Sequence, residues 1–192
     1  MTSRRRTFRT HTWAWAILLA VAQTATAASP TPFVPRDFDV PAKLETDEFR
    51  LRMLTVNDVV KDFDAVTTSV DHLVNIWPGG TWPVGLTLEQ NLIDLGWHQK
   101  EFQLRRSFAY TVVSLAEDRV LGCVYIEPTR KRGHDAVIFL WARQSELEGG
   151  LETRLYEAVR QWVAEEWPFE SPGYPGRSIE WERWSEISDE KR

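Results

Sequence analysis

The sequence contains very little cysteine. Cys123 is the single cysteine in 192 residues, which excludes an intramolecular disulfide. It lies inside the apolar segment Val120–Ile126, whereas a reactive thiol needs an exposed and electropositive setting. We therefore predict that Cys123 is a small buried hydrophobic residue rather than a nucleophile.

An excess of positive charge is also missing. The chain carries 23 basic and 28 acidic residues. Four of the basic residues and none of the acidic ones precede residue 28, which leaves 19 basic against 28 acidic side chains and a net charge of −9 for the rest of the chain. Nucleic-acid binding requires a basic face that displaces counterions from phosphates, so no nucleic-acid partner is predicted.

Several common catalytic signatures are absent from the sequence. There is no P-loop, no dinucleotide-binding glycine pattern and no Ser-His-Asp order. His72, His98 and His134 have no cysteine or carboxylate neighbours at the spacing of metal ligands. The sequence predicts no metal site, and these histidines are interpreted as surface or structural residues.

The N-terminus has the order of a secretory signal. A basic segment is followed by the apolar run Trp13–Ala22 and then by Ala25-Thr26-Ala27, whose small-x-small form suits signal peptidase. Arg5-Arg6-Thr7-Phe8 is similar to the twin-arginine pattern. We predict a signal peptide at residues 1–27, with this similarity to the twin-arginine type, and an exported, periplasmic protein.

Two alternatives remain open for this N-terminal segment. A membrane anchor needs about 20 apolar residues, and the run here is shorter, so no membrane span is predicted in the mature chain. A start of translation further downstream would leave the segment unused, and the protein would then be cytoplasmic.

The rest of the chain is expected to form one domain. Residues 28–44 are rich in proline and are predicted to be an extended lead-in. The domain itself is expected over residues 45–184, because the chain left after cleavage is long enough to build a single core. Residues 185–192 are predicted to be a frayed tail.

Hydrophobic periodicity and helix-capping residues predict the order of the elements. Thr55 with Asp58, and Thr87 with Gln90, have the form of capping boxes at helix starts. The continuous apolar segment Asp135–Trp141 favours a central strand covered on both faces. The expected elements are a strand at 49–54, a helix at 56–77 broken near 67–68, a helix at 87–103, strands at 108–115, 120–126 and 135–141, a helix at 145–167 and a strand at 178–184.

This order resembles that of the GCN5-related N-acetyltransferase (GNAT) superfamily over roughly residues 36–184. Phe49–Thr55, followed by a capped helix, is similar to the first strand and helix of that family, and Arg119–Ile126 is similar to a family strand with an apolar-Gly-apolar pattern. The resemblance implies an α/β fold with a mixed, mostly antiparallel central sheet flanked by helices. It also implies transfer of an acetyl or other acyl group from coenzyme A to an amine on a small molecule or a peptide.

The resemblance further implies where acetyl-CoA binds. Backbone groups of the central strand hold the pantetheine arm, and the loop after it holds the pyrophosphate at a helix N-terminus, where free amides and the helix dipole favour an anion. The matching positions in this sequence are Leu140, Trp141, Ala142, Arg143, Gly149, Gly150 and Leu151.

This loop differs from the family pattern Arg/Gln-x-x-Gly-x-Gly/Ala. Its two glycines are adjacent, and Glu146 and Glu148 lie within it. One carboxylate ~6 Å from a phosphate charge costs about 3 kcal/mol at an effective dielectric constant near 20. The leading prediction is a GNAT-like acyltransferase. The alternative is a catalytically silent GNAT-fold module of the cell envelope that binds a ligand or a protein. Export favours the second, because free acetyl-CoA is a cytosolic metabolite.

Two residues are candidates for the chemistry of transfer. Tyr174 lies in the Pro/Gly loop after the long helix, where related enzymes place the tyrosine that protonates the leaving thiolate; the alternative is a ring that pins the loop to the core. Glu127, at the end of its strand, either serves as the base for the amine proton or lies at the far rim of the sheet. Trp77, Trp82 and Trp97 are expected near the acceptor groove, as an aromatic wall or as anchors of a proline-rich loop.

Overall fold

A six-stranded sheet organises the chain. The computed structural model describes residues 32–190, so the predicted signal at residues 1–27 lies outside the described residues. The strand order is β1-β2-β3-β4-β5-β6, and neighbours are antiparallel except β5 and β6, which are parallel. This confirms the predicted mixed, mostly antiparallel sheet. The strands are β1 (Lys43–Glu45), β2 (Phe49–Met53), β3 (Phe108–Ser114), β4 (Val120–Glu127), β5 (Ala136–Ala142) and β6 (Pro172–Gly173).

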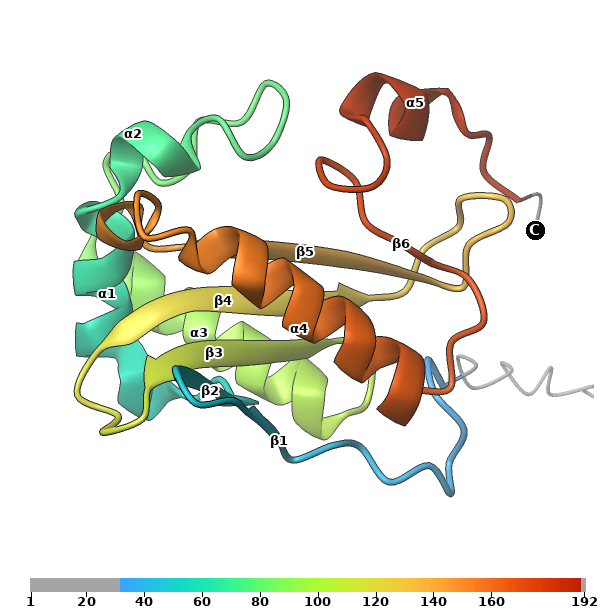
Figure 1. Cartoon of the computed structure of the whole chain (residues 1–192), viewed down its shortest axis with the longest axis horizontal. Coiled ribbons are helices and arrows are strands. Elements are labelled where there is room, and N and C mark those ends of the chain that lie inside the picture. Colours follow the sequence, from blue (N-terminus) through green and yellow to red (C-terminus); the bar gives the residue numbers. More distant parts are fainter. Residues whose placement is uncertain (1–31, 191–192) are drawn as a thin grey trace, which may run out of the picture. The chain divides into compact units, whose positions relative to one another are not determined.

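Helices cover both faces of the sheet (Figure 1). The long helix α4 crosses one face, and α1 and α3 lie on the other. None of the helices in the described range is long and apolar enough to cross a membrane. The helices are α1 (Val59–Thr67), α2 (Val70–Leu73), α3 (Leu88–Gln103), α4 (Leu151–Glu166) and α5 (Trp181–Glu186), with 3-10 turns at Val56–Asp58 and Gln144–Glu146.

Side-chain alternation along the central strands produces two apolar cores, one on each face of the sheet. In β4, Val124 and Ile126 pack in the core under α4, whereas Cys123 packs in the core against α1 and α3. Cys123 is fully buried, as predicted, and burial raises the pKa of its thiol. In β5, Leu140 and Trp141 belong to opposite cores, which confirms that this strand is covered on both faces, although it lies next to the last strand of the sheet rather than at its centre.

Both predicted capping boxes are present. The Asp58 carboxylate accepts hydrogen bonds from the backbone and hydroxyl of Thr55, and Thr87 and Gln90 exchange bonds at the start of α3. The predicted break is confirmed as well, since α1 ends at Thr67 and α2 begins three residues later. The helical segment ends at residue 73 rather than 77.

Two predicted boundaries in the second half are wrong. The long helix begins at Leu151 rather than at residue 145, because Gly150 adopts a left-handed conformation (φ 73°) that separates it from the preceding 3-10 turn. The strand predicted at 178–184 does not form, because α5 begins at Trp181 within that range, and β6 lies earlier, at Pro172–Gly173. Trp181 and Trp184 are three residues apart, so one helical turn lets Trp181 stack on Phe139 and brings Trp184 against the His134 ring.

Strands β5 and β6 pair over only two residues, at Ala136 with Pro172 and Val137 with Gly173. Beyond Gly173 the chain turns away from β5 (Figure 1). The remainder of β5 therefore keeps β4 as its only strand partner among the described residues, and a cleft forms on its other edge.

Segments from both ends of the described range contact the domain. Val34 is buried in the core under α4, and Arg105 donates hydrogen bonds of 2.7 Å and 2.8 Å to the Phe38 and Pro35 carbonyls. Near the C-terminus, the Lys131 side chain donates to the Ile187 carbonyl at 2.8 Å. The chain before β1 and after α5 thus adds contacts to the fold.

Candidate functional site

A cavity of about 310 Å³ lies on the α1 and α3 side of the sheet. We call it the aromatic–acidic cavity, because carboxyl groups and aromatic rings make up much of its wall and no lysine or arginine lines it. The lining residues are Leu54, Asp62, Val66, Trp77, Trp82, Asn91, Asp94, Leu95, His98, Tyr125, Glu127 and Phe139.

Three carboxyl groups reach this cavity from three different elements. Glu127 ends β4 and shares a side of that strand with Tyr125, two residues earlier. Asp62 comes from α1, and Asp94 from α3, one turn before His98. Of the two positions considered for Glu127, the structure places it in the cavity wall rather than at a remote rim.

Burial controls the protonation of these groups. It raises the pKa of the Asp62 carboxyl to about 6, although Asn91 Nδ2 donates a hydrogen bond to that carboxyl at 2.9 Å. Burial likewise raises the pKa of Glu127 and of Asp94. It lowers the pKa of the His98 imidazole to about 4, so that ring carries no charge near neutral pH. The cavity is therefore negative at pH 7 and above.

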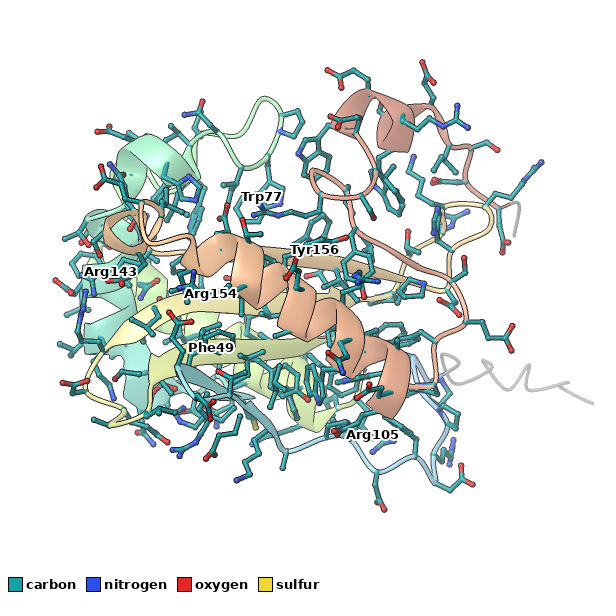
Figure 2. All side chains as sticks on the ribbon, in the orientation of Figure 1. Phe49, Trp77, Arg105, Arg143, Arg154 and Tyr156 are labelled. Carbon is teal, nitrogen blue, oxygen red and sulfur yellow. The ribbon has the colours of Figure 1, made fainter. Side chains whose placement is uncertain are left out.

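Aromatic rings form much of the remaining wall, beside Leu54, Val66, Asn91 and Leu95. The ring centroid of Trp82 lies 5.3 Å from that of Trp77 and 6.2 Å from that of Trp141, and Trp77 is 6.4 Å from Phe139. Figure 2 shows Trp77 between the loop that follows α2 and strand β5. Trp97, expected in the same place, is about half exposed on α3 and does not line the cavity. A wall of this kind attracts cations to its ring faces.

A second cavity, of about 280 Å³, opens where β5 and β6 diverge, and we call it the interstrand cleft. Trp77 and Phe139 line both cavities, so the two adjoin. The other lining residues of the cleft are His72, Asn75, Ile76, Leu140, Glu152, Pro175, Gly176, Arg177, Glu180 and Trp181.

Glu152, in the first turn of α4, holds the polar groups of this cleft together. Its Oε1 accepts from the Ala142 amide at 3.2 Å and lies 3.0 Å from His72 Nε2, and its Oε2 accepts from Arg177 at 3.0 Å. Arg177 also donates to the Leu140 carbonyl at 3.4 Å. Burial alone would raise the pKa of the Glu152 carboxyl, but the bonds from His72 and Arg177 outweigh it and hold the pKa at about 2.

The loop between β5 and α4 bonds mainly to the chain itself. Arg143 is buried, and its guanidinium donates to the Asp64 carboxylate and, at 2.9 Å, to the Thr68 hydroxyl. Figure 2 shows Arg143 at the α1 end of the sheet. The Gly149 carbonyl accepts from Arg154 at 2.6 Å, and the Gly150 amide donates to the Leu147 carbonyl at 2.8 Å. Leu151 is buried as the first residue of α4.

Comparison with known proteins identifies the fold. No family model matches the sequence, and no curated protein matches it. The structure is similar to the ribosomal-protein-S5-alanine acetyltransferase from Vibrio fischeri, at 18% identity and TM-score 0.52 over 65% of this chain and 67% of that one. It is also similar to the microcin C7 self-immunity acetyltransferase MccE, solved with acetyl-CoA and AMP (12%, 0.53, 66% and 68%), and to RimL in complex with coenzyme A (16%, 0.51, 65% and 67%). The chain therefore has the fold of the GNAT acetyltransferases, as the sequence predicted.

Acetyl-CoA does not fit the residues present in the cleft. The resemblance assigns its pantetheine arm to backbone groups of Leu140–Ala142, but the Leu140 carbonyl and the Ala142 amide bond Arg177 and Glu152 instead. The ionised Glu152 would repel the pyrophosphate, at about 3 kcal/mol for each charge pair ~5 Å apart at an effective dielectric constant near 20.

Tyr174 lies in the core under α4, with its ring centroid 5.6 Å from that of Tyr156, and it lines neither cavity. Its buried hydroxyl has no hydrogen-bond partner within the described range, and burial raises its pKa. This placement favours the ring-anchor interpretation, while the role of Tyr174 as an acid stays a prediction.

We expect Tyr174→Phe to keep or raise the free energy of unfolding, by up to about 1 kcal/mol, because it removes a buried hydroxyl that lacks a partner in residues 32–190. Tyr110→Phe is the matched control: its hydroxyl donates to the Pro41 carbonyl at 2.7 Å, so its loss should lower the same quantity by about 1 kcal/mol. Chemical denaturation of both variants measures the difference. A ~100-fold loss of transfer rate in folded Tyr174→Phe would instead support the catalytic acid.

Sequence reasoning missed most of the polar residues of the two cavities. Among them are Asp62, Asp94, His98, Glu152 and Arg177. A signal for the residues of α3 was available, because Asn91, Asp94 and His98 recur at helical spacing on the same side as Leu95. Nothing in the spacing along the chain connects the residues of the interstrand cleft, which lie in α2, β5, α4 and the loop after β6.

Proposed function

We propose that the protein binds a cationic amine in the aromatic–acidic cavity and does not use the cofactor chemistry of its structural neighbours. The observation that carries this proposal is the composition of the cavity wall: three carboxyl groups and four aromatic rings, with no lysine or arginine among the lining residues. An ammonium group gains both from the carboxylates and from the ring faces.

The carboxylates and the aromatic rings of the cavity together favour an amine over other ligands. Contacts of a cation with partly desolvated rings contribute about 0.5–2 kcal/mol, and a hydrogen bond to an ionised carboxylate adds about 1.5–3 kcal/mol. The same carboxylates would repel an anionic ligand. The predicted export of the chain also favours ligand binding, because the periplasm is not where free acetyl-CoA is made; export itself remains a proposal.

Amine binding is expected to weaken as the pH falls from 7.5 to 5. The pKa of Asp62 in the fold is about 6, so this carboxyl takes up a proton in this range and loses its attraction for a cation. Burial shifts the pKa values of Glu127 and Asp94 in the same direction. His98, with a pKa of about 4, stays uncharged and does not offset the change. Titration of the full chain with benzylamine, followed by tryptophan fluorescence, measures the affinity.

Benzyl alcohol is the control ligand, because it has nearly the same shape and no charge. We expect it to bind at least about tenfold more weakly than benzylamine at pH 7.5, and without the pH dependence. Equal affinities for the two ligands, or a benzylamine affinity that does not change with pH, would contradict the proposal.

Acyl transfer to the bound amine is a second candidate function, and it would require acetyl-CoA to displace the contacts that Glu152 makes in the interstrand cleft. The fold of the neighbours supports it, and so does the position of Glu127, whose upward-shifted carboxyl lies in the cavity where it can accept a proton from an amine. Release of free thiol from acetyl-CoA in the presence of a bound amine, lost in Glu127→Gln, would favour this second function over simple binding.

A further inference from the structure

We infer that Glu152 closes the interstrand cleft to coenzyme A and that Arg177 and His72 form a latent anion site behind it. The inference concerns the opposite side of Phe139 from the aromatic–acidic cavity and holds whatever that cavity binds. It goes beyond the poor fit of the cofactor, because it assigns the exclusion to one carboxylate.

The contacts of Glu152 are those that an anionic ligand would make. A guanidinium, an imidazole nitrogen and a backbone amide converge on its two oxygens at 3.0–3.2 Å. The side chain is mostly buried, and its carboxyl stays ionised because the bonds from His72 and Arg177 outweigh burial. The chain thus supplies its own anion to the cleft.

Glu152 also occupies the place that makes this exclusion effective. It is the second residue of α4, a helix of 16 residues whose first turn receives no side-chain cap from Gly150. The free amides at such an end favour negative charge. Next to this helix end, Arg177, His72 and the Ala142 amide form an anion-binding set of donors that Glu152 satisfies from within.

Removing the carboxylate should therefore create an anion site rather than an empty cleft. In Glu152→Ala the guanidinium of Arg177 loses its carboxylate partner, and the amide of Ala142 is freed. We expect the unmodified full chain to show no binding of coenzyme A at 5 mM by isothermal titration calorimetry. We expect Glu152→Ala to bind coenzyme A, and inorganic pyrophosphate, at least tenfold more tightly than the unmodified chain.

Two further variants make the experiment specific. Glu148→Ala removes an exposed acid of the loop that precedes α4 and should leave coenzyme A binding as weak as in the unmodified chain. Glu152→Ala combined with Arg177→Met removes the latent donors and should lose the gained binding again. If Glu152→Ala does not fold, Glu152→Gln carries the test, because the amide keeps the size of the side chain and an acceptor for the Ala142 amide.

Each result of these experiments either supports or contradicts the role of Glu152. Tight binding of coenzyme A by the unmodified chain would overturn the inference, and so would a folded Glu152→Gln or Glu152→Ala that gains no affinity for pyrophosphate. Equal gains in Glu148→Ala would reduce the effect to the net charge of the loop. None of these results depends on benzylamine binding, so this inference and the proposed function can fail separately.

Discussion

Gly122→Ala is expected to lower the free energy of unfolding by about 3 kcal/mol, which is the largest loss anticipated from a single methyl group in this chain. Gly122 lies in β4, between β3 and β5, where the register with β3 shifts after Val112. A Cβ atom built on it would come 2.1 Å from the Trp141 carbonyl oxygen and 3.1 Å from the Ala142 Cα. Both neighbours are backbone atoms of β5, so relief requires the strand to move.

Gly96→Ala is the matched control for this experiment. Gly96 lies inside α3, and its nearest neighbour would be a Val56 methyl group at 3.7 Å, an ordinary contact. Alanine is favoured over glycine in a helix by about 0.5–1 kcal/mol, so the same substitution should stabilise the protein there. Urea denaturation of both variants gives the two free energies, and a stable Gly122→Ala would contradict the close packing of β4 on β5.

The second large effect concerns Asp62, where the expected changes in stability and binding have opposite signs. Asp62→Asn should raise the free energy of unfolding at pH 8 by about 3 kcal/mol, because it removes a buried charge. The Asn side chain can still accept from Asn91 through its carbonyl oxygen. The same variant should weaken benzylamine binding, since an anionic group of the cavity is lost.

The sign of this effect depends on pH. The pKa of Asp62 is raised in the fold, to about 6 from 3.8, so the folded state binds the proton more tightly than the unfolded state does. Stability from this group is therefore full below pH 3.8 and lost as the pH rises through about 6. Thermal unfolding of the parent and of Asp62→Asn should coincide at pH 4 and separate at pH 8, with the variant the more stable. Coincidence at both pH values would mean that Asp62 is not buried as a charge.

The opposite effects on stability and binding bear on why position 62 holds an aspartate. Asp58 and Asp94 both raise the pKa of Asp62 further, so three carboxyl groups lie near one another at the expense of stability. A chain that needed only a packed core would be more stable with an amide there. A carboxyl at this position in spite of that cost supports the proposed cation site.

Much of the fold could be predicted because its signals are local. Thr87 and Gln90 form a capping box that indicates the start of α3, and the continuous apolar run of β5 indicates burial on both faces. The segment at 178–184 could not be predicted in the same way. Its alternating pattern suits a strand, and only the distant partners of Trp181 and Trp184 select a helical turn instead.

The candidate site was less predictable than the fold. Glu127 could be named because it ends a strand beside a turn, but its place in one cavity with Asp62 and Asp94 depends on how α1 packs against β4 and α3 against β3. The sequence placed the cofactor loop between β5 and α4, which stays a prediction, and the acids noted there, Glu146 and Glu148, are not the ones that line the interstrand cleft. Glu152 does so, because the left-handed turn at Gly150 sets the first turn of α4 beside the end of β5.

The hydrogen bond from the Ala142 amide to Glu152 also makes the state of the interstrand cleft visible to deuterium exchange. This amide is protected by a side chain rather than by a neighbouring strand, so a swing of Glu152 away from it is enough to expose it to solvent. Amides of β4, such as that of Val124, lie in a strand flanked on both sides by β3 and β5 and exchange only when the sheet opens. The ratio of the two exchange rates therefore reports how often the cleft is open in a protein that remains folded.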